Sequence, residues 1–199
     1  MSEPTAEVTA ADVLVAQARL RRYLPATPLH HAERFGCWLK LENLQRTGSY
    51  KVRGALNALL AARERGDTRP VIAASAGNHA QGLAWAAHRL GMQAITVMPR
   101  GAPQTKVAGV AHWGATVRLQ GDSYDEARTF AAELATQHGY RVLQAFDDPD
   151  VIAGQGTVGL ELETLAPDVV VVPIGGGGLA SGVALALKSR GVRIIGAQV

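Results

Sequence analysis

The sequence predicts a layered α/β fold, in which short parallel strands alternate with helices. Apolar runs rich in β-branched residues recur along the chain, for example "PVIAA", "QAITVM" and "DVVVVP". Segments with helical periodicity and capping residues separate these runs. Several turns that join a strand to the next helix are rich in small residues, such as "SAGNH" and "IGGGG". Alternation at this spacing is typical of βα units in a parallel sheet.

Capping residues, apolar periodicity and terminal glycines predict the helices. Thr9 with Asp12 has the spacing of a capping box, and so has Ser123 with Glu126. Glycines are favoured where helices end, because they adopt positive φ angles readily. The expected helices are residues 9–23, residues 50–65 closed by Gly66, "SAGNHAQGLAWAAHRLG", a segment opened by Pro103, residues 123–139, residues 151–165 and the segment after Gly178.

Apolar alternation and short buried runs predict the strands. The expected strands are residues 37–41, 70–74, 93–98, 116–119, 141–144, 168–173 and 193–197. Pro25 and Pro28 favour extended chain before the first of them. The acidic, proline-containing segment 147–150 is predicted to be a turn and a boundary between lobes.

Composition excludes several classes of protein. With 47% apolar and 19% charged residues, the chain is typical of a globular protein. The formal charge of +3 is scattered, so a nucleic-acid partner is not expected. The single cysteine, Cys37, allows no internal disulfide and is interpreted as a small apolar strand residue. Residues 1–10 resemble no targeting segment and no apolar run could span a membrane, so we expect a cytoplasmic protein.

Four consecutive glycines, Gly175 to Gly178, lie between a β-branched strand and a helix. Bare backbone amides at such a turn can converge on an anion, which favours a phosphate site over a merely flexible turn. A dinucleotide site would need an acid at the end of the next strand to hold a ribose. Gln198 stands there instead, so the pattern favours a single phosphate.

The turn "SAGNH", residues 75–79, follows another predicted strand and offers amides, a hydroxyl and an amide side chain. Such a turn suits a carboxylate. An equally compatible interpretation is an ordinary helix cap made by Ser75 or Asn78. From its residue type alone, His79 is interpreted as a structural imidazole.

The stretch "GSYKVRGA" places Lys51 in the first turn of a predicted helix, where the helix dipole disfavours a cation. Its neighbours along that helix face are Ala55, Ala58 and Ala62 rather than acids. The dipole, Arg53 and this alanine face are expected to lower the pKa of the amine. A solvated lysine is the common alternative, but a neutral amine is what a Schiff base requires.

A lysine for an aldehyde, a glycine turn for a phosphate and a turn for a carboxylate together describe pyridoxal 5′-phosphate with a bound amino acid. The segments "GSYKVRGA", "SAGNHAQG", "DDPDVIAGQGTVGLE" and "GGGGLASG" resemble, in the same order, those of the serine/threonine dehydratases. These are fold type II pyridoxal-phosphate enzymes, and the similarity extends from about Pro28 onward.

The resemblance assigns a role to each motif. Lys51 would hold the cofactor as a Schiff base, with Tyr50 packed beside the ring and Asn78 bonded to the ring oxygen. The phosphate would rest on Gly175, Gly176, Gly177, Gly178 and Leu179. The substrate carboxylate would lie against Ser75, Ala76, Gly77, Asn78 and His79.

The family fold has two lobes of layered parallel sheets flanked by helices. Residues 1–70 and 148–199 would belong to the large cofactor domain, and residues 71–147 would form a small inserted domain that closes over substrate. Relatives continue past residue 199 with a further part of the large domain, including the Ser or Cys that meets the pyridine nitrogen. The chain is therefore identified as a C-terminally truncated member, and a homo-oligomer is expected because dimers or tetramers are usual among relatives.

The resemblance implies α,β-elimination of L-threonine or L-serine to a 2-oxo acid and ammonia, with Lys51 as general base. Related racemases carry a second serine at Ala76, so elimination is favoured over racemisation. Metal-dependent relatives have a glutamate at Gln198, so no metal site is expected. The alternatives are a non-catalytic relative that acts as a ligand-binding or subunit-interaction module, and a generic nucleotide-binding domain.

Overall fold

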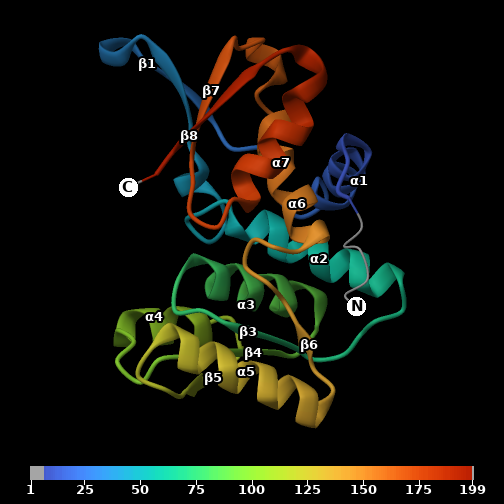
Figure 1. Ribbon diagram of the computed structural model, residues 1–199, viewed down its shortest axis with the longest axis vertical. Helices are drawn as coiled ribbons and strands as arrows, with labels where there is room; N and C mark the ends of the chain where they lie inside the picture. Colours follow the sequence, from blue (N-terminus) through green and yellow to red (C-terminus); the bar gives the residue numbers. More distant parts are fainter. Residues whose placement is uncertain (1–6, 199) are drawn as a thin grey trace.

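The computed structural model describes residues 7–198. It confirms the α/β class with parallel sheets flanked by helices, arranged in two lobes (Figure 1). The expectation that residues 1–10 carry no targeting signal rests partly on residues 1–6, which lie outside the described residues. In the part of the chain that is described, no helix is both long and apolar enough to cross a membrane.

The lower lobe in Figure 1 is built on a parallel sheet in the order β5-β4-β3-β6. Alternate residues of β3 face opposite sides: Val71 and Ala73 join one core cluster, whereas Ile72 packs with α5 in another. Helices therefore cover both faces, as parallel sheets require. The elements are β3 (Val71–Ala74), α3 (Asn78–Leu90), β4 (Ala94–Met98), α4 (Gln104–Ala111), β5 (Thr116–Leu119), α5 (Tyr124–His138) and β6 (Arg141–Val142).

The upper lobe contains a second parallel sheet, β7 with β8, and an antiparallel hairpin, β1 with β2. Helix α2 lies between the lobes and packs against both α3 and α6 (Figure 1). These elements are α1 (Ala10–Leu20), β1 (Leu29–Ala32), β2 (Cys37–Lys40), α2 (Lys51–Glu64), α6 (Pro149–Leu160), β7 (Val169–Pro173), α7 (Gly178–Leu187) and β8 (Arg193–Ala197). Short 3₁₀ turns cover Glu33–Phe35, Glu42–Leu44, Glu163–Leu165 and Lys188–Arg190.

The capping residues and terminal glycines predicted from the sequence are confirmed at the ends of several helices. The side chain of Thr9 caps α1 in a capping box with Asp12. Ser123 accepts a hydrogen bond from the Glu126 N–H at the start of α5. Gly66 and Gly139 adopt positive φ after α2 and α5. These features depend only on residues a few positions apart, which is why the sequence predicts them.

Two expectations were wrong. Segment 147–150 is not a turn: Asp148 is the N-cap of α6, accepting from the Val151 N–H, and Pro149 is the first helical residue. Proline suits that position because its missing N–H would have no partner there. The helix expected over 151–165 ends at Leu160, and a 3₁₀ turn follows it. The pairing of β1 with β2 was not predicted.

Candidate functional site

Lys51 is the first residue of α2 and is half-buried between the lobes. Its Nζ donates a hydrogen bond to the backbone carbonyl of Ala145, at 2.9 Å. The same Nζ lies 5.4 Å from the ring centroid of Tyr50. Burial lowers the pKa of the Lys51 amine below its ordinary value. The first turn of a helix disfavours a cation as well, so both effects favour the neutral amine.

Arg53 does not contribute to that pKa shift, contrary to expectation. Because residues two apart on a helix point about 200° apart, Arg53 faces away from Lys51. Its guanidinium is buried and forms ion pairs with Glu42 and Glu161. The alanine face of α2 is completely buried, as expected: Ala55, Ala58 and Ala62.

The predicted carboxylate turn joins β3 to α3. The side-chain cap proposed for it is wrong: Gly77 is the N-cap, and within residues 7–198 no side chain caps α3. Ser75 Oγ instead accepts a hydrogen bond from the Gly77 N–H at 3.2 Å, while Ala76 packs against the core. Asn78 is the first helical residue and is exposed. The free N–H groups of the first turn are therefore available to an anion.

His79 lies in the next position of α3, with only 4% of its surface exposed. Its Nε2 is 3.3 Å from the carbonyl oxygen of Leu143. Burial lowers the pKa of His79 to about 4, and the nearby Lys51 amine adds to that effect when it is protonated. The ring is therefore neutral at pH 7 and donates from Nε2, while Nδ1 has no partner among the described residues.

The glycine turn connects β7 to α7. Gly177 is the N-cap with φ of 87°, a conformation that glycine adopts at little cost. A Cβ on Gly176 would collide with the ring of Phe146, and one on Gly178 would lie 2.7 Å from the Phe146 carbonyl oxygen. Gly175 is exposed, and Leu179 is buried in the upper core.

The turn fits a phosphate. Along the described part of the chain, no side chain caps α7, so its first N–H groups remain free to donate. A bare backbone carrying such donors at the positive end of a helix is suited to an anion. An amine of lowered pKa and an uncapped glycine turn are the two groups that an aldehyde with a phosphate requires.

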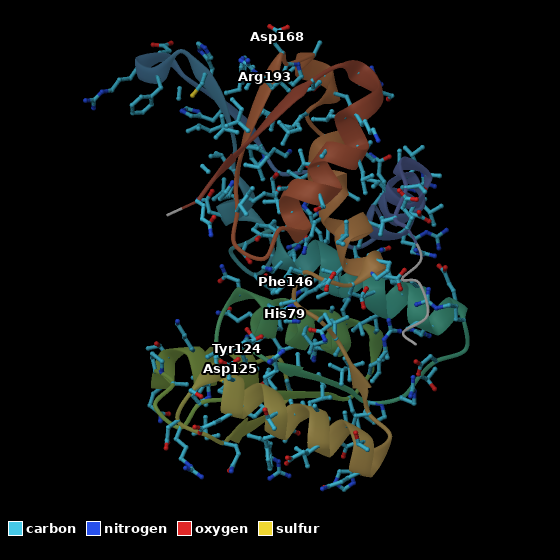
Figure 2. The ribbon with its side chains drawn as sticks, in the orientation of Figure 1. His79, Tyr124, Asp125, Phe146, Asp168 and Arg193 are labelled. Carbon is cyan, nitrogen blue, oxygen red and sulfur yellow. The ribbon has the colours of Figure 1, made fainter. Side chains whose placement is uncertain are left out.

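A segment outside the predicted site contacts all three of its motifs: Lys51, the turn at residues 75–79 and the glycine turn. In residues 143–146, which lead from β6 toward α6, the Leu143 carbonyl faces His79, the Ala145 carbonyl accepts from Lys51, and Phe146 packs on the glycine turn. Figure 2 labels Phe146 and His79, which in that view lie one above the other in the region where the two lobes meet. One signal could have indicated it: Phe146 is an aromatic residue four positions beyond the carboxyl end of the parallel strand β6, in the region where ligands bind in such sheets.

Across residues 7–198, no group of three or more His, Cys, Asp and Glu side chains could hold a metal ion. Gln198 is exposed beyond β8.

Comparisons with known proteins find relatives over nearly the whole chain. A curated L-threonine ammonia-lyase of Thermotoga maritima is 45% identical over 96% of this chain and 50% of its own length. The structure of a processed threonine deaminase isoform from Solanum lycopersicum has a TM-score of 0.89 and 38% identity, over 98% of this chain and 58% of that one. A pyridoxal 5′-phosphate-dependent aspartate racemase has a TM-score of 0.89 and 36% identity, over 98% and 64%.

This chain therefore spans about half the length of the curated relative. A family profile described as "Pyridoxal-phosphate dependent enzyme" matches residues 20–199, which include Lys51, the turn at residues 75–79 and the glycine turn. On this match the chain belongs to the pyridoxal-phosphate-dependent enzymes.

Proposed function

We propose that the protein is a pyridoxal-phosphate-dependent ammonia-lyase that converts L-threonine or L-serine to a 2-oxo acid and ammonia. The observation that carries this proposal is the half-buried amine of Lys51, which donates a hydrogen bond to the Ala145 carbonyl. The next residue, Phe146, packs on the glycine turn, so the amine and the turn contact the same short segment. The names of similar proteins, an ammonia-lyase and a threonine deaminase, support the reaction class.

Different residues would contact different parts of the cofactor. Lys51 would hold the aldehyde, Tyr50 would pack beside the ring and Asn78 would bond to the ring oxygen. The free N–H groups around Gly177 would receive the phosphate, with Leu179 behind them. When bound, pyridoxal phosphate supplies an electron-withdrawing ring that stabilises negative charge at Cα of an amino acid.

The amine also serves as the base. When it is free of the aldehyde, Lys51 Nζ would take the proton from Cα, which requires that the nitrogen be uncharged. Burial lowers its pKa and so favours that form. Its hydrogen bond to the Ala145 carbonyl uses an N–H and leaves the lone pair free.

The carboxylate of the amino acid would lie at the turn formed by Ser75, Ala76 and Gly77, against the uncapped start of α3. Neutral His79 adds no charge there. Ala76 offers no hydroxyl that could return a proton to the opposite face of Cα, which favours elimination over racemisation. We further propose that residues 71–147 close on the large domain, residues 1–70 and 148–199, to exclude water.

A second candidate is a ligand-binding module without turnover. The uncapped N–H groups at the start of α7 support it, because they can hold an anion whether or not turnover follows.

The first test is covalent capture of the cofactor. The purified chain is titrated with pyridoxal phosphate, and the visible absorbance of the bound aldehyde is followed before and after borohydride reduction. Lys51→Ala is expected to abolish capture, whereas Lys106→Ala, at an exposed lysine of α4, leaves it unchanged. Capture that persists in Lys51→Ala would overturn the assignment.

Product analysis then separates the candidates. Release of 2-oxobutyrate from L-threonine supports the ammonia-lyase. Capture without turnover favours the binding module, and inversion at Cα without release of ammonia favours a racemase.

A further test concerns the phosphate. Gly176→Asp is expected to prevent retention of pyridoxal phosphate, because its carboxylate would repel the phosphate and its Cβ would collide with Phe146. Gly101→Asp, in an exposed loop of the lower lobe, provides the matched control. Equal retention by both variants in equilibrium dialysis would show that the phosphate binds elsewhere.

A further inference from the structure

A buried charge cluster lies on the side of α2 opposite to Lys51. Only 2% of the surface of Arg53 is exposed. Its guanidinium donates to both oxygens of Glu42, at 2.8 and 2.7 Å, and to both oxygens of Glu161, at 2.6 and 3.0 Å. It also donates to Thr157 Oγ1 at 3.2 Å. Both carboxylates accept hydrogen bonds from the one planar guanidinium group, which fixes the orientation of that plane.

The cluster joins segments that are far apart in the sequence. Lys40 of β2 forms an ion pair with Glu161 at 2.6 Å and donates to the carbonyl of Thr27. Thr27 in turn donates from its backbone to Glu161 and from its hydroxyl to Glu42. The end of α6, the hairpin strand β2 and the turn that leads toward α2 thus all meet at Arg53. The two cations and two anions balance, so the cluster carries no net charge.

Helices α2 and α6 approach closely at the backbone beside this cluster. At the crossing, Gly54 faces Gly154, and a Cβ on Gly154 would lie 2.7 Å from both the Gly54 Cα and the Arg53 carbonyl oxygen. The hydrogen bonds of Arg53 are directional contacts on the first turn of α2, and one turn further along Asn57 donates to the Asp150 carbonyl of α6 at 2.7 Å.

We propose that Arg53 is a positioning residue for Lys51: by clamping the first turn of α2 to Glu42 and Glu161, it keeps the amine beside the Ala145 carbonyl and away from water. This inference rests on the proposed function, in which that amine holds the cofactor. Arg53 touches neither substrate nor cofactor. Around the amine itself, the titratable groups given by the structure are Tyr50 and neutral His79.

The deciding variant is Arg53→Lys, which keeps the positive charge and removes the planar guanidinium group. The readout is the pKa of the Lys51 amine, measured by NMR after labelling or from the pH dependence of its reaction with pyridoxal. We expect that pKa to rise by at least one unit, as the amine turns toward water. Capture of pyridoxal phosphate should fall at least tenfold.

Two further variants separate positioning from folding. Thr157→Val removes one hydrogen bond from Arg53 and should raise the Lys51 pKa by a smaller amount, which decides the question if Arg53→Lys does not fold. Arg65→Met breaks an exposed ion pair with Asp150 at the other end of α2 and should leave the Lys51 pKa unchanged. An unchanged Lys51 pKa in both folded cluster variants would overturn the inference.

The NMR titration of the Lys51 amine needs no cofactor, so the two proposals can fail separately. If the parent chain captures no pyridoxal phosphate but Arg53→Lys raises the Lys51 pKa, the positioning role stands and the proposed function fails. If the parent chain captures the cofactor and Arg53→Lys changes neither pKa nor capture, the function stands and the positioning role is wrong.

Discussion

At the scale of single residues, the environment of a side chain decides its charge. Lys51 and His79 are both basic, and burial lowers the pKa of each. For Lys51 the consequence is chemical, since the neutral amine is the reactive form. For His79 the consequence is thermodynamic, because its ring must stay uncharged while the chain is folded.

The pH dependence of stability tests the state of His79. Its pKa is about 4 in the folded chain and 6.5 in the reference state, so the unfolded chain binds the proton more tightly and stability falls as pH drops below about 6.5. Between pH 7.5 and 5, we expect His79→Gln to lose about 2 kcal/mol less free energy of unfolding than the parent chain.

Urea denaturation at the two pH values measures this difference. The control is His88→Gln, an exposed histidine of the same helix, which should follow the parent chain. If the parent chain and His79→Gln lost the same free energy of unfolding between pH 7.5 and 5, His79 would not be buried in its neutral form.

At the scale of elements, helix α6 packs tightly on its neighbours because glycines line it. A Cβ on Gly156 would lie 2.8 Å from the Gly182 carbonyl oxygen, and one on Gly182 would collide with the Ile152 carbonyl oxygen. Glycine in a helix is unfavourable by itself. Here it allows α6 and α7 to approach closely, and α7 carries the glycine turn at its start.

Alanine substitutions separate the two effects. Gly182→Ala is expected to destabilise the chain by about 1–3 kcal/mol, the usual cost of overpacking. Gly109→Ala in α4, where a Cβ would make only ordinary contacts with Gln81, is expected to stabilise it by about 0.5–1 kcal/mol. Chemical denaturation of both variants measures the contrast. Stabilisation by Gly182→Ala would show that the interface has room.

At the scale of the whole molecule, the two sheets differ in how they are covered. The lower sheet has helices on both faces, whereas the upper sheet is open on one. Val172 is buried, but Val171 is 63% exposed and Ile195 of β8 is 40% exposed. A run such as "VVVVP" is typical of a strand buried on both faces. The open face is therefore more apolar than a solvent-facing surface requires.

The exposed apolar face of the β7–β8 sheet leads to a prediction about self-association at high concentration. We expect it to self-associate, and Val171→Lys to reduce the association in sedimentation velocity experiments. Leu14→Lys, at an exposed leucine of α1, should have little effect. Equal association of the two variants would show that the sheet face is not responsible.

The sequence by itself determined the alternation of strands and helices, the capping of α1 and α5, and the three motifs of the candidate site. These features arise from signals within a few residues: periodicity, caps and glycine turns. Only the tertiary structure decided that Ala145, 94 residues from Lys51, accepts its hydrogen bond, and that Arg53 lies in an ion-pair cluster instead of acting on that amine. Such contacts depend on strand order and helix packing, which join distant segments, and no local pattern encodes them.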